Sequence, residues 1–368
     1  MSGMTSARNA YIKGNISSLR LKWVAKTGGI IHHAPPLIVN GKVFAATSDD
    51  DMAENSAVFA FNISNGRLLW KKVIGAAVKG GLAADKNNVY ACGADGLVTA
   101  LRQNDGKVLW KSQIADVDKT NGMYGAAVVS GGKLYFYNEA PIIMDVRNGK
   151  ILYQGKTTRE TGGVWHAGVT VAGKTGVSGV SWRYGLKGFD LESGKILWTR
   201  AQGRDFTYLD AAPVYCDGRI YFKGRKKLFI IDLANGNIIK EADKPAGMET
   251  PSIPVVTENA VIFGSCDGFY AYDKKTLKKI WGVKPGYAII PSTAYSRGAT
   301  EVAASPVVVG NTVICGAHDG KLYLLDVRSG KVLQKIQLDS QIMAQCAVSG
   351  NTVAAVSMNG NIYTFTSK

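Results

Sequence analysis

The side chains best suited to chemistry in this sequence are four histidines, His32, His33, His166 and His318. His32 and His33 are adjacent, and adjacent side chains of an extended segment point in opposite directions, so they cannot easily bind one metal ion. A second set carries indole, guanidinium and phenol groups and consists of Trp165, Trp182, Arg183 and Tyr184. These residue types supply large contacts and directional hydrogen bonds at binding surfaces. They indicate a ligand or partner site, and a zinc site is not expected.

An acidic segment formed by Asp49, Asp50, Asp51 and Glu54 is a second place where chemistry could occur. The carboxylates of Asp49, Asp51 and Glu54 could hold Ca2+, but the segment has neither the spacing nor the glycine of an EF-hand loop. A solvated acidic loop is the simpler interpretation. We therefore expect no bound metal here.

Motifs for covalent or redox catalysis are not recognisable. The five cysteines are scattered singly and form no C-x-x-C pair, so we expect buried structural thiols. The run Gly176-Val-Ser-Gly179 has neither the spacing of a nucleophile elbow nor its strand-to-helix context. The Asp-x-His and Gly-Asn-His signatures that assemble the two-metal site of metallophosphoesterases are absent as well. The sequence predicts no catalytic centre in this chain.

Composition narrows the class of protein further. Hydrophobic residues make up 46% and charged residues 20% of 368 positions, and no stretch of 18 apolar residues could span a bilayer. The formal net charge of +16 would suit nucleic acid if the cations clustered, but most are scattered, as at Lys107 and Lys331. The short run Arg225, Lys226 and Lys227 is the exception. We expect no nucleic-acid partner.

A repeated phrase organises the whole chain: an apolar strand, a polar turn with glycine, and a second strand that often ends in tryptophan. Seven copies occur, the first being Val58 to Trp70, and their turn positions are separated by 40, 43, 45, 42, 41 and 53 residues. An apolar hairpin precedes each phrase, which predicts four antiparallel strands per unit. A period of 40 to 45 residues with four strands is typical of propeller blades.

An eighth blade must be composite. The last unit, Cys346 to Phe365, provides three strands, and Leu19 to Trp23 has the pattern of a fourth strand without a blade of its own. We therefore predict that residues 19–25 pair with residues 361–366 and close the ring, because an open edge would otherwise remain. This makes residues 19–368 one eight-bladed, all-β propeller, with residues 1–18 as a tail or added leader.

Five tryptophans share one slot of the repeat and are therefore expected to be structural, packing on the neighbouring blade. They are Trp23, Trp70, Trp110, Trp198 and Trp281.

The repeat also resembles a known family. The phrase from Leu186 to Trp198, Leu-Lys-Gly-Phe-Asp-Leu-Glu-Ser-Gly-Lys-Ile-Leu-Trp, is similar to that of the pyrroloquinoline-quinone-repeat propellers. That family includes quinoprotein dehydrogenases, a lipoprotein of outer-membrane barrel assembly, and propellers fused to calcineurin-like metallophosphoesterases. The resemblance covers residues 19–368 and implies the fold, but one fold serves several functions.

The resemblance implies three alternative functions. The first is a non-catalytic scaffold; the second is an accessory domain of a larger enzyme, such as a metallophosphoesterase, whose catalytic domain lies elsewhere. The third is a quinone-dependent dehydrogenase with Ca2+. The resemblance implies that an alcohol dehydrogenase of this family would have a disulfide between adjacent cysteines, and this sequence has no adjacent cysteines, so we disfavour this function. We favour the scaffold and expect no cofactor. The resemblance implies the periplasm or cell envelope, whereas a complete chain without a signal segment would be cytoplasmic.

Strand order assigns the candidate residues to one face of the ring. The second-to-third connections and the connections between blades must emerge together, and the sequence predicts that they are long and irregular. Binding residues tend to occur on such loops. Alignment of the first strands places five candidates at the mouth of the central channel: His33, Lys79, Tyr124, Trp165 and Asp210. The same face carries His32, His166, Trp182, Arg183, Tyr184 and His318. We expect a monomer that binds a protein or saccharide over this mouth.

Overall fold

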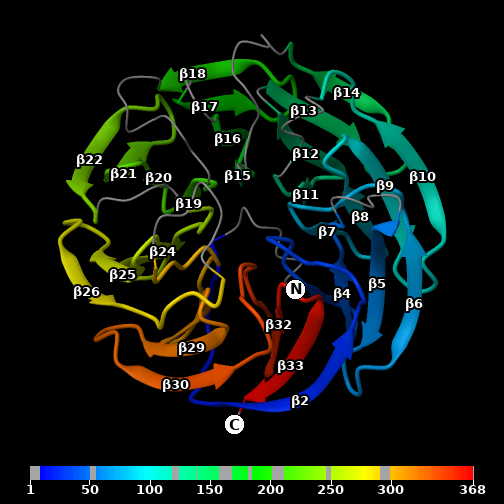
Figure 1. The fold of residues 1–368 in the computed structure, drawn as a ribbon. Helices are drawn as coiled ribbons and strands as arrows, with labels where there is room; N and C mark the ends of the chain where they lie inside the picture. The colour runs from blue at the N-terminus through cyan, green and yellow to red at the C-terminus, as the bar shows by residue number, and fades with distance from the viewer. Residues whose placement is uncertain are drawn as a thin grey trace.

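The computed structural model describes residues 9–49, 55–117, 123, 125–138, 140–156, 168–180, 185–200, 211–245, 250–290 and 299–367. These residues form eight antiparallel blades around a central axis, which confirms the predicted eight-bladed β-propeller (Figure 1). The described part of the chain contains no helix that could cross a bilayer.

In blades 1 to 7 the four repeat strands run in chain order from the axis to the rim. The strands of blades 1 to 3 are β3 (Leu37–Val39), β4 (Lys42–Ala46), β5 (Ala57–Asn62) and β6 (Leu68–Val73); β7 (Leu82–Ala84), β8 (Asn88–Cys92), β9 (Leu97–Arg102) and β10 (Val108–Gln113); β11 (Val128–Ser130), β12 (Lys133–Asn138), β13 (Ala140–Asp145) and β14 (Ile151–Gln154). Those of blades 4 to 6 are β15 (Val169–Ala172), β16 (Thr175–Val180), β17 (Gly185–Asp190) and β18 (Ile196–Arg200); β19 (Val214–Cys216), β20 (Arg219–Lys223), β21 (Lys227–Asp232) and β22 (Ile238–Asp243); β23 (Val255–Val256), β24 (Ala260–Ser265), β25 (Gly268–Asp273) and β26 (Lys279–Val283). Blade 7 consists of β27 (Val307–Val309), β28 (Thr312–Gly316), β29 (Lys321–Asp326) and β30 (Val332–Gln337).

Blade 8 closes the ring as predicted. It combines β31 (Ala347–Ser349), β32 (Thr352–Val356) and β33 (Asn361–Ser367) from the end of the chain with β2 (Leu19–Lys26) from its start. The two termini pair antiparallel, with Leu19 opposite Ser367 and Lys26 opposite Asn361. Figure 1 shows β2 as the outermost strand beside β33. The pairing gives β33 a hydrogen-bonded neighbour on its outer edge.

Residues 9–18, which precede β2, pack against the ring, whereas the sequence prediction assigned residues 1–18 to a tail or leader. Residues Tyr11–Ile12 form β1, which pairs in parallel with β27 on the axial side of blade 7. The Asn9 side chain accepts a hydrogen bond from the Val256 N–H and donates one to the Val256 carbonyl. Ala10 and Ile16 are almost fully buried. Blade 7 thus has a fifth strand that no repeat pattern encodes.

The tryptophan slot joins neighbouring blades, which confirms its structural role. Each of the five indoles donates its N–H to the carbonyl that follows the third strand of the next blade, at 2.8 to 3.0 Å: Trp23 to Ile63, Trp70 to Gln103, Trp110 to Val146, Trp198 to Leu233 and Trp281 to Val327. At the Trp70 junction, a Cβ on Gly106 would lie 2.7 Å from the ring, and the φ of Gly106 is +70°. Only glycine satisfies both conditions.

Three junctions use other residues in the same slot. Tyr153 takes the place of the indole against Gly194. Lys240 donates to the Lys275 carbonyl, and buried Leu277 stands where other turns have glycine, with a φ of +54°. At the composite blade, where no turn joins β33 to β2, Gln334 donates to the Leu19 carbonyl and accepts from the Leu19 N–H. Gln334 therefore connects blade 7 to the start of β2.

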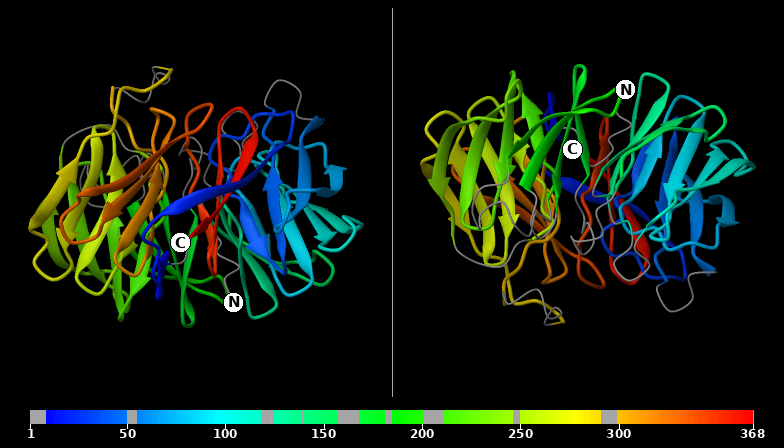
Figure 2. Two further views of the ribbon diagram at one scale, coloured as in Figure 1. Left: turned by 90° about the horizontal axis from the view of Figure 1, so that it is seen from below. Right: turned by 90° about the horizontal axis from the view of Figure 1, so that it is seen from above.

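The disc has two unlike faces, which we call the turn face and the long-loop face. First-to-second and third-to-fourth turns emerge on the turn face, while second-to-third and blade-to-blade connections emerge on the long-loop face. Residues 284–290, which follow β26, project from the long-loop face in both edge-on views (Figure 2). The expectation that all its connections are long was wrong, because β24 and β25 are separated by only Cys266 and Asp267. The long connections on this face are mainly those that join one blade to the next.

Candidate functional site

The structure describes five of the candidate residues: His32, His33, Lys79, His318 and Asp49. The others lie outside the described residues: Tyr124, Trp165, His166, Trp182, Arg183, Tyr184, Asp210, Asp51 and Glu54. The site below is therefore built from the described residues of the long-loop face.

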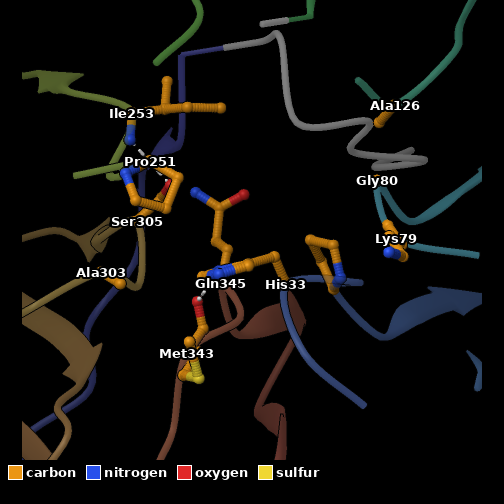
Figure 3. Close-up of a pocket in the computed structure, with 11 residues that line it drawn as sticks. His33, Lys79, Gly80, Ala126, Pro251, Ile253, Ala303, Ser305, Met343 and Gln345 are labelled. Atoms are coloured by element: carbon orange, nitrogen blue, oxygen red, sulfur yellow. Dashed lines mark hydrogen bonds between the residues drawn. The ribbon is translucent and has the colours of Figure 1, made fainter. Parts of the chain in front are cut away.

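A pocket opens at the mouth of the central channel. It is a small, open pocket with a cavity volume of about 40 Å³. Figure 3 shows the residues that line it, with a hydrogen bond of 3.2 Å between His33 Nδ1 and the Met343 carbonyl. The lining residues are His33, Pro35, Lys79, Gly80, Ala126, Pro251, Ile253, Ala303, Ser305, Met343 and Gln345. His33 and Lys79 thus share this pocket.

The lining follows a simple register that the sequence alignment captured only in part. Six lining residues lie two positions before the first repeat strand of a blade: Pro35, Gly80, Ala126, Ile253, Ser305 and Gln345. Four others lie four positions before one: His33, Pro251, Ala303 and Met343. Alternate residues of an extended segment share a side, so both positions face the axis. Extending the alignment to blades 6 to 8 would have predicted Pro251, Ala303 and Met343.

The lining of the channel mouth combines polar side chains that form hydrogen bonds with two nitrogen-bearing side chains on one side, those of His33 and Lys79. His33 and Lys79 come from the connections into blades 1 and 2, and the lining includes no carboxylate among the described residues. Ser305 Oγ accepts the Ile253 N–H at 2.8 Å, and Gln345 Nε2 donates to the Pro306 carbonyl at 3.2 Å. These bonds hold the connections of blades 6, 7 and 8 in place. The described lining is suited to acceptor groups such as carbonyl or carboxylate oxygens.

His32 lines a different cavity at the rim between blades 8 and 1. This open cavity has a volume of about 560 Å³, and Asp49, Phe59 and Lys71 line it as well. The Asp49 carboxylate accepts the Ile30 N–H at 2.9 Å, so it fastens the connection that enters blade 1. The two adjacent histidines therefore face separate cavities, as expected for an extended segment.

His318 belongs to the same face but does not line the channel-mouth pocket. Its side chain is 1% exposed, and its Nδ1 lies 3.7 Å from Glu301 Oε2. Burial lowers the pKa of His318 to about 4, and the nearby Asp319 carboxylate opposes this shift. His318 is consequently neutral near pH 7 and acts inside blade 7, away from the channel mouth.

The described residues do not fit a quinone with a hard metal ion. Such an ion is held chiefly by carboxylate oxygens, and the described pocket lining contains no carboxylate. Among the described residues, no group of three His, Cys, Asp or Glu side chains could hold a metal. We therefore derive no chemical step through such a group.

Comparisons with known proteins agree with the propeller and identify its family. The protein called outer membrane protein assembly factor BamB from Shewanella oneidensis is 23% identical over 344 residues, which cover 83% of this chain and 77% of that protein. The crystal structure of BamB from Moraxella catarrhalis superposes with a TM-score of 0.72 at 16% identity, covering 95% of this chain and all of that one. A europium-containing methanol dehydrogenase gives a TM-score of 0.79 at 15% identity, covering 99% and 97% of the two chains, and shares the fold.

A sequence model of one family matches almost the entire chain, over residues 4–199 and 183–368. Its description is outer membrane protein assembly factor BamB. This protein therefore belongs to the BamB family of pyrroloquinoline-quinone-repeat propellers.

Proposed function

We propose that this chain is a non-catalytic scaffold of the cell envelope that binds a protein partner over the channel mouth on its long-loop face. The observation that carries the proposal is the pocket at that mouth, which His33 and Lys79 line and which hydrogen bonds between side chains and backbone hold in shape. A preformed polar cup on a rigid ring costs little entropy to use for binding. Family membership supports the envelope and a protein partner.

Site-specific photo-cross-linking tests the location of the partner. A photoreactive amino acid replaces Lys79 in one variant and the exposed turn-face residue Lys107 in a matched control. We expect one discrete cross-linked protein from the Lys79 position and none from Lys107. Once that protein is purified, Lys79→Ala should weaken its binding by roughly 1 to 3 kcal/mol if Lys79 is a hot spot. Equal products from both positions would contradict the proposed face.

A dehydrogenase is the competing function, because the fold is shared with the europium-containing enzyme. Purified protein should not reduce a dye in the presence of added quinone, Ca2+ or a lanthanide, and alcohols or aldoses. Robust quinone-dependent turnover would replace the scaffold proposal. A glycan array distinguishes a saccharide ligand from a protein partner.

A further inference from the structure

Three large hydrophobic side chains are exposed close together on the long-loop face. No other loop among the described residues exposes such a group. Tyr287 is 81% exposed, Ile289 49% and Ile290 52%, all within four residues of the connection between blades 6 and 7. The other exposed large hydrophobic residues of the described chain lie on outermost strands, apart from Ile30. Exposed apolar groups gathered in this way mark contact surfaces.

Hydrogen bonds to blade 7 hold this segment in place. The Gly286 N–H donates to the Asp319 carboxylate at 2.9 Å, and the Ile289 N–H donates to the His318 carbonyl at 2.9 Å. Gln341 Nε2 donates to the Ile290 carbonyl at 2.7 Å. Because the backbone is fixed at these points, the apolar side chains are held outside the core.

The layer beneath the segment is polar and closely fitted. His318, Asp319 and Gln341 are each at most 4% exposed. A Cβ on Gly320 would lie 2.6 Å from Ile289 Cδ1, and the φ of Gly320 is +75°. Because Gly320 has no side chain, Ile289 can pack against it. The buried polar residues below leave no apolar core into which Tyr287 and Ile290 could fold.

Cations lie on the same face. Lys284 is exposed and begins the connection that carries the apolar segment. Two blades away, the second-to-third turn of blade 5 contains half-buried Arg225 and exposed Lys226. Lys244 braces this turn, donating from Nζ to the Arg225 carbonyl at 2.7 Å. Blades 5, 6 and 7 are neighbours in the ring, as β22, β26 and β30 show in Figure 1.

We propose that Tyr287, Ile289 and Ile290, together with the basic turn at Arg225 and Lys226, dock the propeller onto an anionic lipid surface. Amphipathic surfaces bind membranes when apolar groups enter the headgroup boundary and cations contact acidic lipids. The net charge of +16 strengthens this attraction. This inference goes beyond the proposed function.

Vesicle flotation with purified full-length protein tests the apolar part. The probe is a vesicle of phosphatidylethanolamine and phosphatidylglycerol, and phosphatidylcholine vesicles are the neutral comparison. Tyr287→Ser/Ile289→Ser/Ile290→Ser should lower the partition coefficient at least tenfold. Leu197→Ser/Ile239→Ser is the matched control, because both residues are exposed and apolar but lie on the rim. It should bind like the unmodified protein.

A second pair of variants tests the charged part. Arg225→Gln/Lys226→Gln should lower binding to anionic vesicles about tenfold and weaken its salt dependence. Arg67→Gln/Lys107→Gln removes two exposed cations from the turn face and should change binding less than twofold.

Fluorescence locates the contact independently of partition. Four of the five native cysteines are buried, so after Cys216→Ser an environment-sensitive dye can be attached through Ile290→Cys, with Leu197→Cys as control. The emission should shift to the blue on anionic vesicles at position 290 only. Any of three results would overturn the proposal. These are a failure of the unmodified protein to bind anionic vesicles at low salt, binding of the triple variant as strong as that of the unmodified protein, and an emission shift only at position 197. Because the vesicles contain no protein, this outcome is independent of the partner proposed above.

Discussion

The two faces of the propeller differ in how they use the repeat. On the turn face, five junctions among the described residues share one contact, an indole N–H on a carbonyl beside a glycine turn. At the channel mouth, the equivalent positions hold different residues, as His33, Pro251, Ala303 and Met343 show. The comparison teaches that repetition maintains the ring, while variation on the opposite face leaves positions for recognition.

The largest effect should come from breaking the closure that both faces depend on. Removing residues 1–26 deletes β1 and β2 and exposes the outer edge of β33. We expect the cooperative thermal transition, followed by circular dichroism, to disappear or fall by more than about 10 °C. Arg20→Ala/Lys22→Ala, at exposed positions of β2, is the control and should leave the transition in place. An unchanged transition after the deletion would show that the closure contributes little.

Substitutions on opposite faces should separate stability from binding. Trp70→Ala should lower the free energy of unfolding by about 3 to 5 kcal/mol, because it leaves a cavity and removes the donor to the Gln103 carbonyl. Gly106→Ala should also destabilise, since its Cβ would meet the Trp70 ring. Lys79→Ala at the channel mouth should lower the same quantity less than Trp70→Ala does, because Lys79 is half-buried and lies outside the packed junctions between blades. Urea denaturation measures all three, and equal losses for Trp70→Ala and Lys79→Ala would remove the distinction.

A smaller effect should appear as acid sensitivity of the long-loop face. The pKa of His318 is about 4 in the folded protein and near 6.5 when unfolded, so the unfolded chain binds more protons between these values. Stability should therefore fall as the pH drops from 6.5 to 4, by up to about 3 kcal/mol from this group. His318→Gln should flatten that part of the profile. Denaturation midpoints measured across the window check this, and an identical slope in the variant would be the contrary result.

Most of the fold could be predicted because its determinants are local. Turn glycines and alternating apolar strands recur at a period close to 40 residues, so the blade count and the closure by residues 19–25 follow from pattern alone. The structure added β1, whose two-residue parallel pairing with β27 has no repeat signal. Gln334 could not be interpreted either, because its partner Leu19 is 315 residues away.

The site was less predictable because its residues come from different blades. Alignment placed His33 and Lys79 near the axis, and both line the pocket at the mouth. His318 was grouped with them by loop membership, yet it is buried in blade 7 beside Glu301. Strand order assigns Tyr287 to the long-loop face, but the sequence does not show that Ile289 and Ile290 remain exposed beside it.

By itself, the sequence determined the propeller, the number of its blades, the strand that closes it and the slot in which tryptophans join neighbours. These features depend on short-range periodicity and on contacts between consecutive repeats. Only the tertiary structure decided which loop residues meet at the channel mouth, which histidine is buried, and which apolar groups remain outside. Those outcomes depend on the approach of connections from non-consecutive segments, and burial is a property of that assembled surface.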